Sequence, residues 1–311
     1  MRKARAMRRV FWMIVMTALA TQAEAASLTV VATTPDLAAI AREVGRDRVS
    51  VTSMAAGGQD PHFLDPRPSF LVKLNRADLL IEGGLDLEIG WLPALLASAR
   101  NPKLRPGELG RLNASERIAV LGVPGGRVDR SQGDVHGKGN PHFLTDPVNG
   151  AVVADTIAQR LCRLDVEGCV DYRANAEAFR RRIDAAVAGW TDVLSPYRGT
   201  KIVAYHDTWS YFTKRFGLTT VGFVEPKPGV PPPPSHISAL VDLIQREHVP
   251  VIVMEPYASR SIPDLVARQT GCRVLVLAPT VGALPATDDY VAMVDANVKA
   301  LARALARTTS R

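Results

Sequence analysis

The residues from 28 to 54 read LTVVATTPDLAAIAREVGRDRVSVTSM, and this stretch decides the fold. An apolar run over residues 28–33 is followed by Pro35, which suits the first turn of a helix, and by a helical pattern that Gly45 closes. A second β-type run occupies residues 49–54. Strands that alternate with helices predict an α/β fold built on a parallel sheet.

The same alternation continues along the chain and restarts after Pro196. We predict further strands at 79–82, 201–205, 219–223, 251–254 and 273–277, and helices at 69–76, 87–98, 147–164, 208–216, 235–247, 262–271 and 288–305. Apolar residues recur at three-to-four spacing over 171–194, which predicts one long helix between the two halves. The predicted fold is therefore α/β, with two lobes, each a mostly parallel sheet flanked by helices, joined by one long rigid helix. The boundaries are a signal peptide at 1–25, an N-terminal lobe at 26–170, the linking helix at 171–196 and a C-terminal lobe at 197–311.

The first 25 residues have the pattern of a cleaved secretory signal: five basic residues, an apolar run from Val10 to Ala20, and Ala23-Glu24-Ala25 before Ala26. The apolar run is shorter than the roughly 20 residues that cross a bilayer. We expect a free periplasmic protein without a membrane anchor. Without this leader, 33 basic residues face 30 acidic ones, a net charge of +3, which does not favour nucleic acid as a partner.

Cys162 and Cys169 lie seven residues apart between two predicted helices, and an exported chain meets an oxidising compartment. We expect a local disulfide between them. Cys272 begins an apolar strand and is expected to be a small buried hydrophobe.

A short phrase occurs twice, as Asp60-Pro61-His62-Phe63-Leu64-Asp65-Pro66 and as Asn140-Pro141-His142-Phe143-Leu144-Thr145-Asp146-Pro147. Proline restricts its own backbone and that of the residue before it, so each histidine lies on a stiff, extended loop. Imidazole is the commonest metal ligand, and paired rigid histidine loops indicate a transition-metal site. A loop histidine that bonds only to backbone is the alternative for each one taken alone.

Two more candidates follow strands of the second half. His206 comes directly after the strand 201–205, and Glu255 after 251–254. Ligands of open α/β sheets bind beyond the carboxyl ends of the strands, so His62, His142 and His206 can reach one crevice. Glu255 is either a fourth ligand, a partner that orients a histidine, or a structural hydrogen-bonding group. His248 and His236 are expected to be structural, and His136 lies in a segment, Val123 to Asn140, expected to be a mobile loop with at most a transient metal contact.

Taken together, these residues resemble the periplasmic solute-binding proteins of zinc and manganese ABC transporters, the cluster A-I family with its zinc-binding ZnuA type. The likeness covers nearly the whole mature chain, and the motifs that carry it are Val30-Val-Ala-Thr-Thr-Pro35, Pro61-His62, Ala77-Asp78-Leu79, Pro141-His142, Asp146-Pro147, Tyr205-His206, Glu255-Pro256 and Thr270-Gly271.

The resemblance implies that Zn²⁺ is held in the cleft between the lobes by His62, His142 and His206, with Glu255, another nearby carboxylate or water in the fourth position. The metal is then delivered to a membrane permease, and we expect a monomeric, non-enzymatic protein. Manganese-type relatives usually carry a carboxylate at the third position, so His206 favours zinc. Many relatives have an aspartate ligand where this chain has Ala278. A three-histidine zinc hydrolase, a binder of manganese or another divalent metal, and an adhesin or metal buffer are the alternatives.

Overall fold

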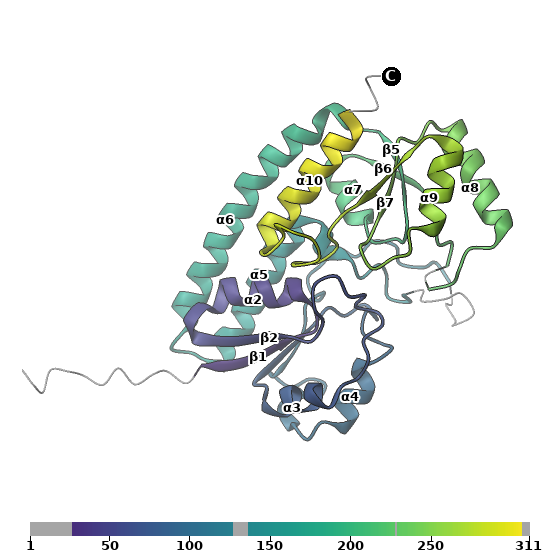
Figure 1. Ribbon diagram of the computed structural model, residues 1–311. Helices are drawn as coiled ribbons and strands as arrows, with labels where there is room; N and C mark the ends of the chain where they lie inside the picture. Colours follow the sequence, from purple (N-terminus) through teal and green to yellow (C-terminus); the bar gives the residue numbers. More distant parts are fainter. Residues whose placement is uncertain (1–26, 127–135, 228, 307–311) are drawn as a thin grey trace, which may run out of the picture.

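Two four-stranded parallel sheets form the framework of the chain, as a computed structural model shows (Figure 1). The structure describes residues 27–126, 136–227 and 229–306. The first sheet has the order β2-β1-β3-β4 and the second β6-β5-β7-β8. The strands are β1 (Leu28–Ala32), β2 (Val49–Ser53), β3 (Leu79–Glu82), β4 (Arg111–Asn113), β5 (Lys201–Ala204), β6 (Thr219–Phe223), β7 (Val251–Met254) and β8 (Arg273–Val276). The expected parallel α/β architecture is confirmed.

Helices cover both sheets, and apolar side chains from strands and helices fill the space between them. The α-helices are α2 (Pro35–Gly45), α3 (Pro68–Arg76), α4 (Leu92–Ser98), α5 (Pro147–Leu164), α6 (Cys169–Leu194), α7 (Ser210–Phe216), α8 (Pro234–Arg246), α9 (Ser261–Thr270) and α10 (Tyr290–Ala306). One continuous core runs from residues of the first sheet to residues of the second, and smaller cores lie on the outer face of each sheet. No helix in the described ranges is both long and apolar enough for a membrane span.

The chain passes from the first sheet to the second through α5 and α6, and α6 runs along both halves of the molecule (Figure 1). Along its length α6 packs against α2, α5 and α10. Its buried stripe consists of Tyr172, Ala176, Phe179, Ile183, Trp190 and Leu194, as the spacing predicted, with Val187 only partly buried. A helix of 26 residues is about 39 Å long at 1.5 Å per residue, so it can brace both halves stiffly.

Direct contacts also lock the two halves together. Arg215 of α7 donates to both carboxylate oxygens of Asp146 at 2.8 Å each. The same Asp146 caps the start of α5, because it accepts from Val148 N at 3.0 Å. From α10, the Tyr290 hydroxyl donates to Leu144 O at 2.6 Å. The segment that carries the second Pro-His phrase is therefore fixed to elements of the second sheet.

Two sequence predictions need correction. The helix expected at 87–98 begins only at Leu92, because Leu85 and Asp86 have positive φ angles and the chain makes turns before it. Pro93 then lies in the first turn, where it is tolerated, and does not interrupt the helix. The sequence reading also missed β4, whose three residues are too few to show a period. The expected signal peptide, and residues 127–135 of the expected loop at 123–140, lie outside the described residues.

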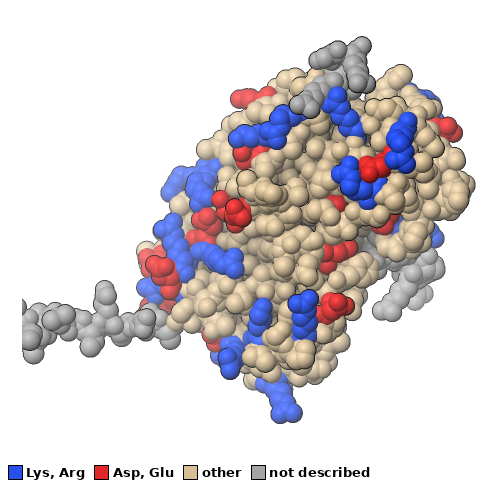
Figure 2. Space-filling view, in the orientation of Figure 1, with Lys and Arg blue, Asp and Glu red and all other residues tan. Residues whose placement is uncertain are grey.

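The surface carries both signs of charge. Figure 2 shows lysine and arginine side chains interspersed with acidic ones over the face in view. The structure also contains ion pairs between side chains of opposite charge, among them Arg182 with Glu43 at 2.9 Å, which ties α6 to α2. This mixture agrees with the near balance of charge in the part of the chain after the leader.

Cys162 and Cys169 form a disulfide that closes the turn between α5 and α6, as expected from their spacing. A cross-link over so short a loop lowers the conformational entropy of the unfolded chain, which raises the free energy of unfolding by roughly 2 kcal/mol. We expect the double variant Cys162→Ser/Cys169→Ser to lose about this much free energy of unfolding in urea titrations, with metal affinity unchanged. The wild type with reductant should match the variant. Identical midpoints with and without reductant would show that the bond adds no stability.

Candidate metal centre

The first Pro-His loop follows the carboxyl end of β2 and is held by its own aspartate. Asp60 Oδ1 accepts from His62 N at 3.0 Å, a local turn that fixes the loop. The same oxygen lies 2.6 Å from His62 Nδ1. Trp91 Nε1 donates to Pro61 O at 2.9 Å. His62 is buried, with an exposed fraction of 8%. Asp60 therefore both braces the loop and orients the imidazole.

The second Pro-His loop repeats this turn with a different neighbour. Asn140 Oδ1 accepts from His142 N at 2.8 Å, as Asp60 does from His62. Here the side-chain amide of Asn140 donates across the molecule to Asp207 O at 2.6 Å, and Tyr211 donates to Asn140 O at 2.9 Å. The duplicated phrase thus forms the same turn twice. The second copy is attached to the half that carries His206.

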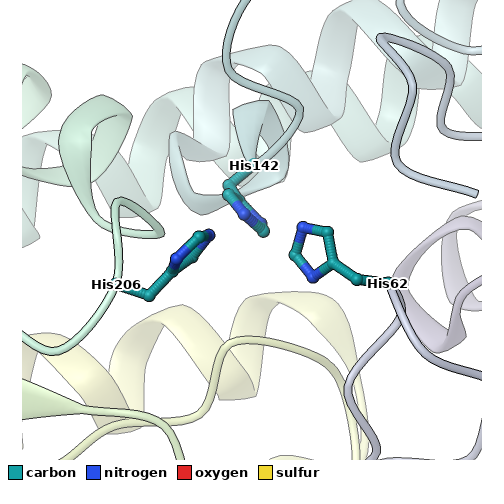
Figure 3. Close-up of side chains that lie close together, drawn as sticks. All are labelled: His62, His142 and His206. Atoms are coloured by element: carbon teal, nitrogen blue, oxygen red, sulfur yellow. The ribbon is translucent and has the colours of Figure 1, made fainter. Parts of the chain in front are cut away.

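His206 lies just beyond the carboxyl end of β5, and its ring meets those of His62 and His142 (Figure 3). The ring centroids are 5.1 Å apart for His62 and His142, 5.4 Å for His62 and His206, and 5.3 Å for His142 and His206. One nitrogen of each ring lies within 4.8 Å of the other two. Three loops from two sheets therefore bring the three predicted histidines into one triangle.

Burial keeps the imidazoles of His142 and His206 in the neutral form that binds metal. It lowers the pKa of His206 to about 3, helped by the neighbouring His62. The pKa of His142 falls well below its usual value for the same reason, with the other histidines adding to the effect. Desolvation disfavours the charged ring, and neighbouring imidazoles disfavour it further. Protons therefore compete weakly for these nitrogens near neutral pH.

Glu255 follows β7 but lies outside this group of three. Its side chain is fully buried, and Oε1 accepts from Trp209 Nε1 at 2.9 Å. Burial raises the pKa of the carboxyl to about 7. The Thr208 hydroxyl lies near it without meeting hydrogen-bonding geometry. Glu255 and His206 both line one cavity of about 250 Å³, together with Asp60, His62, Glu225 and Tyr257 among others.

One further histidine reaches the site, which the sequence reading treated as a loop residue with at most a transient contact. His136 stacks on His62 with ring centroids 5.1 Å apart, and the two Nε2 atoms are 3.1 Å apart. Its pKa falls to about 4, mainly through burial. No local pattern marks this residue, because its position is seen only in its contact with His62, 74 positions away in the chain. His236 and His248 stay apart: His236 bonds to Phe223 O at 2.9 Å, and His248 precedes the amino end of β7.

At position 278, where many relatives were expected to have an aspartate, the alanine offers no ligand atom. Ala278 is buried, and both its backbone groups bond to the Asn297 side chain at 2.8 Å. Its backbone is therefore fixed although it contributes no donor to a metal. Any fourth ligand must come from elsewhere in the chain or from water.

Two parallel α/β lobes with a cluster of imidazoles where the lobes meet define a metal-binding solute-binding protein of the cluster A-I fold. The model of the family described as "Zinc-uptake complex component A periplasmic", ZnuA, matches residues 30–304. The chain belongs to this family. It is an extracytoplasmic, metal-binding component of an ABC transporter, which implies a permease as partner, and it is not an enzyme.

Individual relatives are distant but similar over most of their length. A metal ABC transporter substrate-binding lipoprotein, ScbA of Streptococcus cristatus, is 25% identical over 92% of each chain. The manganese ABC transporter substrate-binding lipoprotein scaA of Streptococcus gordonii is 26% identical over 76% of this chain and 74% of its own. The crystal structure of a ZnuA deletion mutant with zinc bound has a TM-score of 0.74 at 25% identity and covers 90% of this chain and 97% of that one.

The Asp60 contact yields a prediction for metal affinity. Burial alone would raise the pKa of Asp60, but the hydrogen bonds from His62 outweigh this and lower it, so the carboxylate stays charged beside the ring. Partners that orient a ligand typically contribute 10- to 100-fold to metal affinity. We expect Asp60→Asn, which keeps the turn acceptor but removes the charge, to weaken zinc binding about 10-fold in chelator competition.

A matched control is Asp65→Asn, an exposed residue of the same loop. It should leave the affinity unchanged. If both variants bind zinc as tightly as the wild type, the Asp60 carboxylate does not tune His62.

Proposed function

We propose that this protein captures Zn²⁺ with His62, His142 and His206 and delivers it to the permease of a zinc ABC transporter. Zinc is a borderline-soft cation that imidazole suits, whereas manganese prefers carboxylate and water oxygen. Within the described residues the group of candidate ligands contains three histidines and no carboxylate. Asp60 is bonded to His62, and Glu255 to Trp209.

The observation that carries this proposal is the state of His142. Its Nε2 is buried and has no hydrogen-bond partner in the part of the chain that the structure describes. A buried polar atom without a partner costs about 1–3 kcal/mol, so such atoms in native proteins have a reason. A cation bound at the centre of the triangle would supply the partner that the protein does not.

Manganese is the second candidate, because scaA is described as a manganese transporter component and is similar over most of this chain. Against it stands the imidazole at position 206, since an all-nitrogen set discriminates against a hard cation. Glu255 bonds to Trp209 through Oε1 and keeps Oε2 without a partner among the described residues, but it is not in the group of ligand atoms around the three histidines. We therefore place zinc first and manganese second.

The setting of this function is also part of the proposal. Residues 1–25 act as a leader that directs the chain to the periplasm, where the mature protein is a monomer without a membrane anchor. Its lobes span 26–170 and 197–311, joined by a helix over 171–196. The disulfide between Cys162 and Cys169 supports an oxidising compartment.

Metal analysis of the purified mature chain tests the proposal, followed by competition between zinc, manganese and copper. We expect one zinc per chain and displacement of manganese by zinc at equal concentration. Zinc uptake by vesicles with the cognate permease should depend on the loaded protein. Stoichiometric manganese that zinc does not displace would refute the zinc assignment.

A further inference from the structure

We propose that His136 is the fourth metal ligand of this chain, in place of the aspartate that is absent at Ala278; this rests on the proposed function. Its Nε2 lies 3.1 Å from Nε2 of His62. Zinc holds imidazole nitrogens at about 2.0–2.1 Å in a tetrahedron, which places two ligand nitrogens about 3.3 Å apart. The two rings thus already stand at nearly the separation of two ligands on one ion.

The hydrogen bonds on the other side of each ring point to the same conclusion. His62 Nδ1 faces the Asp60 carboxylate at 2.6 Å, so the proton of the neutral ring belongs there and Nε2 carries a lone pair. The His136 ring bonds to the Asp86 backbone. If its single proton serves that bond, two lone pairs face each other at 3.1 Å. A cation between them turns this repulsion into ligation.

Backbone contacts hold His136 at this place. His136 O accepts from Gly139 N at 3.1 Å. Gly139 has a φ of +106°, and a Cβ there would lie 2.3 Å from the Val120 side chain, so the tight return of the chain requires glycine. The residue that follows Gly139 is Asn140, whose side chain forms the turn with His142 N. His136 is therefore connected to the site by a short, ordered segment.

The competing donors are less well placed. Glu255 is held by Trp209 through Oε1, and its unpartnered Oε2 is not in the group of ligand atoms around the three histidines; Ala278 has no donor atom. The His136 ring is 6.3 Å from that of His142, compared with 5.1 Å from that of His62, so it approaches the triangle from its His62 side. His136 is not in the group whose ligand atoms all lie within 4.8 Å of one another, so ligation requires its side chain to rotate toward His142. Four protein ligands leave no open position for a reactive water, as suits a carrier and not a hydrolase.

The test compares the purified mature wild type with His136→Ala and His136→Gln, loaded with one equivalent of zinc. X-ray absorption should count four imidazoles in the wild type, and three plus an oxygen in both variants. Chelator competition should show a loss of affinity of about 10- to 100-fold. Glutamine keeps a hydrogen-bond donor for the Asp86 backbone, so a loss in both variants assigns the effect to the imidazole. Thermal unfolding of the metal-free proteins shows whether each variant remains folded.

Lys138→Ala is the control in the same segment, because it removes the ion pair with Asp86 and no ligand. It should retain four imidazoles around zinc. Three imidazoles in the wild type, with unchanged affinity in His136→Ala, would overturn the assignment of His136 and leave the three-histidine function intact. A wild type that binds no zinc would instead refute the proposed function itself.

Discussion

Replacement of His206 by alanine is expected to reduce zinc affinity by about 100- to 1,000-fold. Structural zinc sites bind with roughly 10–16 kcal/mol, or about 2.5–4 kcal/mol for each of four ligands. His206 is the member of the triangle that comes from β5, and its ring is 5.4 Å from that of His62 and 5.3 Å from that of His142. Without His206, only His62 and His142 of this group of three remain to bind the metal.

Chelator competition and calorimetric titration of the metal-free mature chain measure this loss, and His62→Ala should behave similarly. His248→Asn is the matched control. His248 precedes the amino end of β7, whereas His206 follows the carboxyl end of β5, which is parallel to β7 and paired with it. Asparagine tolerates the positive φ of 52° at this position. Tight stoichiometric zinc binding by the His206→Ala protein would contradict the three-histidine site.

The second large effect concerns Asp36, whose replacement by asparagine should stabilise the metal-free protein above neutral pH. Asp36 lies in the first turn of α2 with an exposed fraction of 4%, and it accepts from Val281 N of the other half at 2.7 Å. Burial raises its pKa from 3.8 to about 7, against the opposing hydrogen bond from Val281. Asparagine can keep this acceptor without a charge that must be desolvated.

The direction of the pH dependence follows from linkage. Between pH 4 and 7 the folded state holds a proton on Asp36 that the unfolded state has released, so the wild type loses stability as the pH rises. The shift corresponds to roughly 3 to 4 kcal/mol, after allowance for the helix N-terminus, which favours the charged form. Asp36→Asn should therefore equal the wild type near pH 3.5 and exceed it by about that amount at pH 8.

Urea titrations of the metal-free proteins from pH 3.5 to 8 measure this difference. Asp47→Asn, at an exposed position after α2, is the control and should follow the wild-type curve. Parallel curves for Asp36→Asn and the wild type would show that Asp36 is not buried between the two halves as a largely protonated acid.

Much of the fold could be predicted because its signals are local. Residues 28–54 contain a strand, a proline that starts a helix, a glycine near its end and a second strand, and the structure forms β1, α2 and β2 there in parallel register. One strand and the start of one helix were less visible. β4 has only three residues, and the turns at Leu85 and Asp86 depend on packing around buried Glu88, which accepts from Gly83 N at 2.7 Å and from Thr33 Oγ1 at 2.6 Å.

In the candidate site, too, some residues could be predicted from local sequence signals and others could not. His62 and His142 were found through a repeated phrase, and the repeat has a physical basis, since Asp60 and Asn140 form the same turn. His206 was found through its place after a strand. Glu255 was found by the same rule, yet the tertiary structure turns it toward Trp209 and not into the triangle. Strand position predicts which edge a residue reaches but not the direction of its side chain.

The sequence by itself determined the parallel α/β architecture, the long helix α6, the disulfide and the three histidine loops, because each depends on residues near one another in the chain. Only the tertiary structure decided that the second histidine loop is clamped to the other half by Tyr211, that Asp36 reaches Val281, and that His136 stacks on His62. These contacts join residues separated by 71, 245 and 74 positions. No periodicity or local turn encodes such a pairing, since it arises when the packed helices and sheets bring distant loops to one edge.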